Sequence, residues 1–172
     1  MRDNKKLVVY FSYTGNTRKI AKKIKEELHC DILELKPVKP YSTDYQTVVD
    51  EEQNNESTKK TPEIKDINID LSNYDEVIIG TPVWWYTIAP VVRTFLKQND
   101  LAQKIIIPFT TNAGWLGRTF KEIENLCPNS NIQKEMNIVF KSYSDKLVTS
   151  EVEIQNWINS IKNKEEKLWE KI

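Results

Sequence analysis

The chain has 172 residues, of which 25 are basic and 25 acidic, so its formal net charge at pH 7 is zero. The length suits a single domain, 1–172, and the balanced charge argues against a nucleic-acid-binding protein, which needs a basic surplus. Two cysteines outside any CxxC pair argue against a disulfide framework or a zinc site. The first apolar run covers only residues 7–11, which is too short for a signal peptide or a membrane span. We therefore expect a cytoplasmic protein.

Short apolar runs alternate with amphipathic helical segments along the whole chain. Residues 7–11 are continuously apolar, which is typical of a strand buried on both faces of a parallel sheet. In 16–28, apolar residues recur at helical spacing among lysines and glutamates. The alternation predicts a three-layer α/β/α domain with a parallel sheet. The further strands expected lie at 32–35, 76–80, 104–109 and 137–140. The further helices expected lie at about 43–57, from Pro90 onward, from Leu116 to Cys127 and from Ile154 to Ile161. Whether the last helix continues to Leu168 and Trp169 stays open.

An acidic excursion interrupts this pattern at about 38–76. It contains ten acidic residues and four lysines, and its apolar residues are sparse apart from the expected helix. Either a solvated surface or a surface that docks a partner protein explains such a composition, and both readings stay open.

Three loops that follow expected strands carry unusual residues, and ligands of open α/β sheets bind beyond the carboxyl ends of the strands. The first loop is Ser12-Tyr13-Thr14-Gly15-Asn16-Thr17, directly before a helix. The free N–H groups and dipole of a helix N-terminus favour an anion such as phosphate. The hydroxyl groups of the loop add donors, and its glycine permits a tight turn. An ordinary helix cap would explain the same residues.

The second and third loops, at 80–86 and 110–118, carry aromatic residues and glycines. Trp84, Trp85 and Tyr86 directly follow a buried strand and cannot all enter the core, so they are typical of a pocket wall or of a cover over a flat ligand. Asn112 and Trp115 suit the edge of a heterocycle. Aromatic packing on a neighbouring helix and a plain turn are the respective alternatives.

These three motifs, in this order, resemble the flavodoxin-like family of FMN-binding flavoproteins, specifically its short bacterial and archaeal flavodoxins. The resemblance rests on [ST]-x-T-G-x-T at 12–17, on G-x-P-x-W-W at 80–85 and on a glycine-containing third loop, and it covers about 6–162. It implies a five-stranded parallel sheet in the order 2-1-3-4-5 and one non-covalent FMN.

The resemblance also implies a set of cofactor-binding residues. The phosphate would bind in loop 12–17 and the flavin ring between the other two loops, with either Trp84 or Trp85 on the ring. No metal is implied. The implied residues are Ser12, Tyr13, Thr14, Gly15, Asn16, Thr17, Pro82, Val83, Trp84, Trp85, Tyr86, Thr111, Asn112, Ala113, Gly114, Trp115 and Gly117.

Two departures from the family pattern lie in the aromatic loops. Trp115 stands where many relatives have a small residue, so we expect a more shielded ring edge. Residues 83–86 contain no glycine, which predicts a stiff loop and favours two-electron over one-electron chemistry.

The implied function is a flavodoxin-type electron carrier in electron transport, in which the flavin carries the chemistry and no side chain is catalytic. The alternatives are an NAD(P)H-dependent FMN quinone reductase, which is an oxidoreductase, and a flavin-free, non-catalytic binding module. The expected partner is a redox protein or a small quinone-like acceptor, with no nucleic acid and no membrane. A monomer and a homodimer both remain open.

Overall fold

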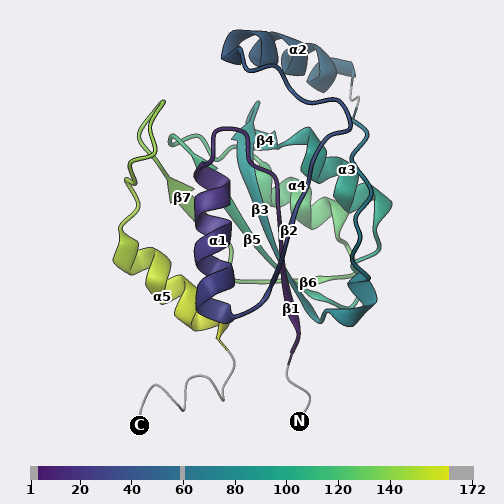
Figure 1. Ribbon diagram of the computed structural model, residues 1–172, viewed down its shortest axis with the longest axis vertical. Helices are drawn as coiled ribbons and strands as arrows, with labels where there is room; N and C mark the ends of the chain where they lie inside the picture. Colours follow the sequence, from purple (N-terminus) through teal and green to yellow (C-terminus); the bar gives the residue numbers. More distant parts are fainter. Residues whose placement is uncertain (1–3, 59–60, 163–172) are drawn as a thin grey trace.

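The computed structural model describes residues 4–58 and 61–162, which form a parallel sheet with helices on both faces (Figure 1). The strands are β1 (Lys6–Tyr10), β2 (Asp31–Glu34), β3 (Glu76–Trp84), β4 (Thr87–Ile88), β5 (Ile105–Asn112), β6 (Asn131–Ile132) and β7 (Met136–Val139). The helices are α1 (Asn16–Leu28), α2 (Tyr45–Thr58), α3 (Pro90–Gln98), α4 (Thr119–Leu126), α5 (Glu151–Ile161) and the short 3-10 helix η1 (Leu71–Asn73). Among the described residues, no helix combines the length and the apolar character that crossing a membrane requires.

The sheet has the order β2-β1-β3-β5-β6, with β4 paired to β3 and β7 paired to β5. The predicted order 2-1-3-4-5 is confirmed, because the third, fourth and fifth predicted strands correspond to β3, β5 and β7. The two additional strands are short. β6 pairs with the beginning of β5 and β7 with its end, so these two share one edge of the sheet. β4 turns back on β3 as an antiparallel hairpin.

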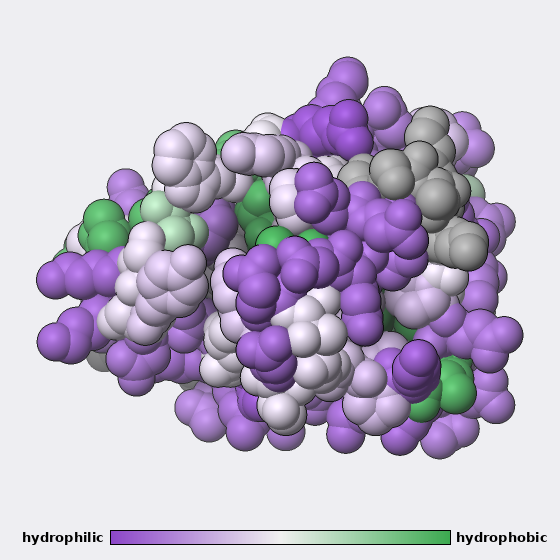
Figure 2. Space-filling view, turned by 90° about the horizontal axis from the view of Figure 1, so that it is seen from above, coloured by the Kyte–Doolittle hydropathy of each residue, from purple (hydrophilic) through white to green (hydrophobic). Residues whose placement is uncertain are grey.

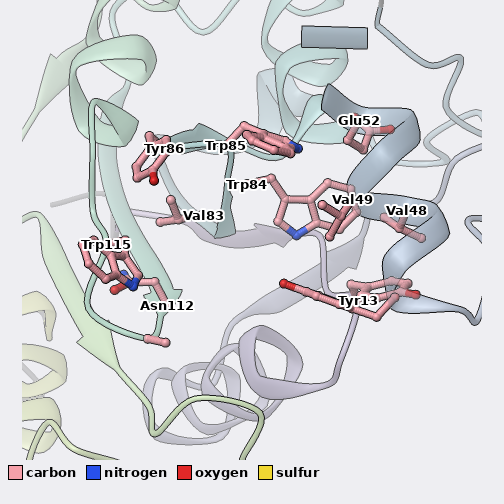
Figure 3. Close-up of a pocket in the computed structure, with 12 residues that line it drawn as sticks. Tyr13, Val48, Val49, Glu52, Val83, Trp84, Trp85, Tyr86, Asn112 and Trp115 are labelled. Atoms are coloured by element: carbon pink, nitrogen blue, oxygen red, sulfur yellow. The ribbon is translucent and has the colours of Figure 1, made fainter. Parts of the chain in front are cut away.

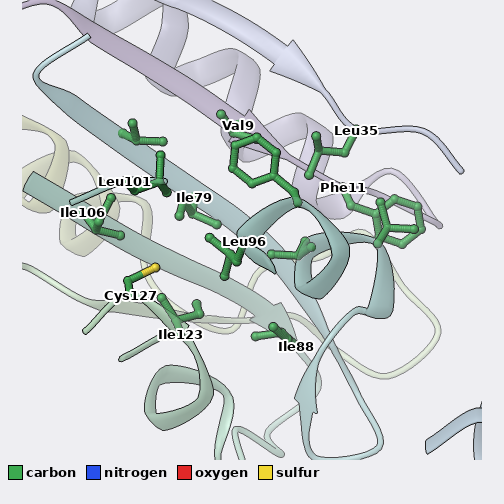
Figure 4. Packing of buried hydrophobic residues seen from close by; sticks show 14 of the residues in the cluster. Val9, Phe11, Leu35, Ile79, Ile88, Leu96, Leu101, Ile106, Ile123 and Cys127 are labelled. Carbon is green, nitrogen blue, oxygen red and sulfur yellow. The ribbon is translucent and has the colours of Figure 1, made fainter. Parts of the chain in front are cut away.

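Alternate residues of the central strands enter two separate hydrophobic cores. Val8 of β1 and Ile78 of β3 face α1 and α5, whereas Val9 and Ile79 face α3 and α4. Figure 4 shows the second of these cores, which also holds the thiol of Cys127. Burial raises the pKa of this thiol to about 11. Both faces are covered, which explains why the sequence of β1 is continuously apolar rather than alternating.

β3 and β5 run further than the sequence predicts. We expected them to end at Gly80 and Phe109, but parallel pairing continues through Thr81 with Thr110 and Pro82 with Thr111. Thr81 and Thr110 are fully buried, and Thr81 Oγ1 accepts a hydrogen bond of 3.0 Å from the N–H of Ala89. Polar residues therefore extend both strands, because their hydroxyl groups find partners inside the fold.

The helices follow the predicted spacing, with shifts at their ends. α4 begins at Thr119 rather than Leu116, because Gly114 and Gly117 adopt left-handed backbone angles and prevent an earlier start. α5 begins at Glu151, where Ser150 Oγ accepts a hydrogen bond from the N–H of Glu153 and caps the helix. The continuation to Leu168 and Trp169 lies outside the described residues.

α2 lies within the acidic excursion and above the carboxyl ends of the strands (Figure 1). The helix is mostly polar. Among its residues with described side chains, Val48 is the one apolar residue that is buried. Its position above the sheet makes it one wall of the region where the predicted loops converge.

Gly80 is required by the close approach of Phe109, its neighbour across β3 and β5. A Cβ atom on Gly80 would lie 2.2 Å from Cζ of the fully buried Phe109 ring. We therefore expect Gly80→Ala to lower the free energy of unfolding by about 1–3 kcal/mol, as overpacking does. Chemical denaturation of this variant, of Phe109→Leu and of the double variant measures the coupling. The two losses should be less than additive, and strict additivity would contradict this contact.

Candidate functional site

A cavity of about 870 Å³ lies at the carboxyl end of the sheet, within the size range of small-molecule sites. The loops after β1, β5 and β7, the end of β3 and the residues around the start of α2 all contribute to its walls. Figure 2 views the molecule from this end, where pale and hydrophobic residues are exposed among mostly hydrophilic ones. Of the sequence-predicted residues, the walls include Tyr13, Thr14, Asn16, Pro82, Val83, Thr111, Asn112, Ala113 and Trp115.

One end of this cavity is the turn that leads into α1. Gly15 has a φ of 106°, and Ser12 Oγ accepts hydrogen bonds of 3.2 Å from the N–H groups of Gly15 and Arg18. α1 begins at Asn16, so the N–H groups of its first turn have no acceptor within the helix. Asn16 Nδ2 donates to the carbonyl oxygen of Ser144 at 3.0 Å and joins this turn to the loop after β7. The turn is thus preorganised to bind an anion.

Thr17 differs from the other hydroxyl residues of this turn. It is buried, and its Oγ1 lies 2.7 Å from Oγ1 of Thr111. This hydrogen bond joins the first turn of α1 to the end of β5. The sequence predicts a direct ligand contact for both residues, whereas the structure places the Thr17 hydroxyl against Thr111, which itself lines the cavity.

The second loop is a tight hairpin between β3 and β4. Val83 pairs with Ile88 and Trp84 with Thr87, so Trp85 and Tyr86 form the two-residue turn. Both turn residues have positive φ, 50° and 63°, a conformation that usually requires glycine or asparagine. The loop that we predicted to be stiff, because it lacks glycine, contains a turn whose two residues adopt a costly backbone conformation.

The third loop supports this hairpin by direct backbone contact. The N–H of Arg118 donates to the carbonyl oxygen of Tyr86 at 2.8 Å. A Cβ atom on Gly117 would lie 2.1 Å from the same oxygen, and Gly117 has a φ of 55°. Asn112 Oδ1 accepts a hydrogen bond of 2.8 Å from the N–H of Gly114, which shapes the loop before this contact. The second and third loops therefore form one connected unit.

The two adjacent tryptophans have different environments. Trp84 packs edge-on against Phe11, Tyr13 and Tyr41, with ring centroids 5.6, 5.6 and 5.0 Å from its own. Trp85 belongs to the turn and, like Trp84, lies toward α2 and away from Trp115 (Figure 3). Neighbouring aromatic rings therefore hold Trp84 in one orientation.

A second cavity of about 370 Å³ lies between the hairpin and α2 (Figure 3). Trp84, Trp85 and Tyr86 line it from the hairpin. Its walls also include six residues that line the larger cavity, so the two cavities adjoin: Tyr13, Tyr45, Val83, Asn112, Ala113 and Trp115.

Five of the residues predicted for the site line neither cavity, and two segments that do line a cavity were not predicted. Ser12, Gly15, Thr17, Gly114 and Gly117 shape the backbone of the loops. The missed segments are α2 residues such as Val48 and Val49, and the loop 140–145 after β7. The loop could have been found, because the carboxyl end of every strand in a parallel sheet meets the same edge.

Arg93 of α3, Glu122 of α4 and Thr87 of β4 form a mostly buried polar cluster beneath the hairpin. Glu122 accepts hydrogen bonds from Thr87 Oγ1 and from the guanidinium of Arg93, with which it forms an ion pair. Burial disfavours the carboxylate, but the hydrogen bonds from Arg93 and Thr87 and the charge of Arg93 outweigh it and lower the pKa of Glu122. The cluster thereby fixes β4 to the helices below.

Comparison with known proteins gives a family and several structural relatives. The family model described as flavodoxin matches residues 5–161. A flavoprotein from Lactobacillus acidophilus NCFM, solved in complex with FMN, is 28% identical with a TM-score of 0.70, over 78% of this chain and 92% of that one. A protein from Bacteroides eggerthii DSM 20697 assigned as a flavoprotein is 28% identical with a TM-score of 0.74, over 92% of this chain and 98% of that one. A search of curated proteins found no match.

The cluster beneath the hairpin predicts a pH dependence of stability. Because folding lowers the pKa of Glu122, its stabilisation is present above the pKa of an unfolded glutamate and is lost as the pH falls through the folded pKa. We expect Glu122→Gln to lower the free energy of unfolding by roughly 1.5–3 kcal/mol at neutral pH and to flatten its decline in acid. Glu124→Gln, in an exposed pair on the same helix, is the control. Equal acid profiles for wild type and Glu122→Gln would contradict the assignment.

Proposed function

Because this chain belongs to the flavodoxin family, whose model matches residues 5–161, we propose that it binds FMN without a covalent bond and acts as a flavodoxin-type electron carrier. The observation that carries the proposal is the combination of an anion-binding turn at one end of the larger cavity with aromatic walls at the other. A mononucleotide with a phosphate and a flat ring has these two requirements.

The residues present fit FMN. The first turn of α1 with Thr14 and Asn16 would hold the phosphate, and the backbone of Pro82, Val83 and residues 111–113 would border the ring. Bound FMN supplies the electron-transfer chemistry, and the chain binds and orients it and keeps water from it. The relative from Lactobacillus acidophilus NCFM, solved in complex with FMN, supports this assignment.

The charges around the cavity favour a low potential. Among the described residues that line it, Lys141 is the sole cation, and it belongs to the loop after β7 rather than to the aromatic loops. A reduced, anionic ring would therefore gain little electrostatic stabilisation from nearby positive charge.

Exchange of electrons with a partner protein requires an accessible rim around the cofactor. Four aromatic residues around the two cavities are largely exposed: Tyr45 (52%), Tyr86 (59%), Trp115 (68%) and Tyr143 (93%). Tyrosine and tryptophan are enriched in protein interfaces. The acidic excursion, which includes α2, borders the same rim and would attract a basic partner through long-range electrostatics. These features support the carrier role.

A quinone reductase is the second candidate function, and one observation favours it. The smaller cavity adjoins the larger one and could hold a small acceptor beside the cofactor. The two functions differ in what the protein does with a nicotinamide donor, which an experiment can separate.

The FMN assignment predicts that Thr14 contributes to phosphate binding. Thr14→Ala should weaken FMN binding by roughly 1–3 kcal/mol, because it removes a hydrogen bond to a charged group. Fluorescence titration measures this change, since FMN emission reports its binding. Riboflavin, which lacks the phosphate, is the matched control ligand and should bind wild type and variant equally. An equal loss for both ligands would show that Thr14 does not recognise the phosphate.

The carrier role predicts little turnover with a nicotinamide donor. We expect the FMN-loaded protein to oxidise NADH or NADPH, with a quinone as acceptor, no faster than the same concentration of free FMN. Steady-state absorbance of the nicotinamide measures the rate. Turnover far above that of free FMN would refute the carrier role and favour the quinone reductase.

A further inference from the structure

The loop that follows β7 forms a wall of the larger cavity that the sequence motifs do not predict. We call residues 140–147 the β7 loop. The N–H of Lys141 donates to the carbonyl oxygen of Lys146 at 2.8 Å, and an antiparallel bridge joins Phe140 to Leu147, so the loop folds back on itself. It rises above the carboxyl end of the sheet, where α2 also lies (Figure 1). Its residues 140–145 line the larger cavity.

Two contacts connect the β7 loop to elements on the other side of this cavity. Asn16 Nδ2, in the first turn of α1, donates to the carbonyl oxygen of Ser144 at 3.0 Å. The ring of Tyr143 lies edge-on to Tyr45 of α2, with the two centroids 5.8 Å apart. β7 and β2, the strand before α2, lie at opposite edges of the sheet. The β7 loop therefore reaches from one edge toward the other and lies beside residues 12–17, which we call the phosphate turn.

The β7 loop brings polar and charged groups to the wall of the cavity. Lys141 is the sole cation among the described lining residues, and it forms no ion pair within the part of the chain that the structure describes. Ser142 and Ser144 add hydroxyl groups, and Ser144 Oγ accepts a hydrogen bond of 3.0 Å from the N–H of Lys146 and keeps its own proton to donate. Ammonium and hydroxyl groups both donate to phosphate oxygens. Asp145 is the acidic residue of the described lining and opposes an anion.

The phosphate turn itself supplies only uncharged donors. Residues 12–17 contain no basic side chain, and the guanidinium of Arg18 forms an ion pair with Glu34 at the end of β2. A phosphate with two negative charges would lack a counter-charge there unless a neighbouring element provides one. The β7 loop, which is hydrogen-bonded to this turn, provides Lys141. This step rests on the proposed FMN site.

We propose that the β7 loop is the second half of the phosphate site, and that Lys141 makes the cavity select a phosphorylated flavin over the same flavin without its phosphate. The ammonium group of Lys141 is the counter-charge for the phosphate, and the hydroxyl groups of Ser142 and Ser144 add donors beside it. Lys141 is exposed, so salt screens its attraction for the phosphate. The preference for the phosphorylated ligand is therefore largest at low salt.

The test compares FMN with riboflavin, which has the same ring and lacks the phosphate. Fluorescence titration gives the affinity of wild type and Lys141→Gln for each ligand, above the second pKa of a phosphate monoester, which is about 6. We expect Lys141→Gln to weaken FMN binding about three- to tenfold at low salt, because it removes an exposed charge pair, and to leave riboflavin binding unchanged. The loss should shrink between about 0.01 M and about 1 M salt, as the screening length falls from about 30 Å to about 3 Å.

Three further variants separate the charge of Lys141 from net charge and from loop structure. Lys146→Gln removes the same charge from the same loop, but Lys146 lines neither cavity, so both affinities should stay close to those of wild type. Lys141→Arg keeps the charge and should keep the preference for FMN. Asp145→Asn removes the opposing charge and should strengthen FMN binding without changing riboflavin binding.

The outcomes separate this inference from the proposed function. A wild-type protein that binds no FMN overturns both. A protein whose preference for FMN over riboflavin is lost in Thr14→Ala but kept in Lys141→Gln supports the phosphate turn and overturns the role of Lys141. An equal loss of both ligands in Lys141→Gln also overturns it, because Lys141 would then act on the ring or on the fold. Equal losses of FMN in Lys141→Gln and Lys146→Gln overturn it too, because net charge alone would explain them.

Discussion

The close approach of Gly117 to the carbonyl oxygen of Tyr86 is the contact on which the geometry of the site depends. Two consecutive aromatic residues, Trp85 and Tyr86, adopt left-handed angles in a two-residue turn, which costs free energy. The N–H of Arg118 and the absence of a side chain at Gly117 allow the third loop to lie against this turn and hold it. This contact therefore fixes the tip of the hairpin whose aromatic residues line the smaller cavity.

The buried charges beneath the hairpin also hold the hairpin in position. A buried ion pair such as that of Arg93 and Glu122 seldom adds much net stability, because both charges lose their hydration. Here the carboxylate also accepts a hydrogen bond from Thr87, which belongs to β4, so the pair specifies where the hairpin lies relative to α3 and α4. The hairpin is thus fixed from the side by a backbone contact and from below by a charged cluster.

The sequence predicts the layers and the strand order but not all the walls of the site. Periodicity is a property of neighbouring residues, so it identifies α1 and the buried strand β1 within the chain. The extension of β3 through Thr81 depends on a hydroxyl partner at Ala89, which no local pattern reveals. The position of α2 over the cavity depends on tertiary packing of a mostly polar helix, so its composition suggests a solvated or docking surface rather than a wall. The hydrogen bond of Thr17 to Thr111 joins residues far apart in the chain and has no local signal, and the direct phosphate contact expected of Thr17 stays a prediction.

The two candidate functions make different demands on the residues around the two adjoining cavities. A carrier needs an exposed cofactor rim, whereas a reductase needs a sheltered space for a small acceptor. Trp84 is held among three other rings and gives the smaller cavity a fixed wall, while Tyr86 and Trp115 remain mostly exposed at the rim. A rigid inner ring on the hairpin and an exposed rim shared by the hairpin and the third loop suit either use. None of the described residues that line the smaller cavity is basic, so an anion placed there would lose its hydration without gaining a positive partner.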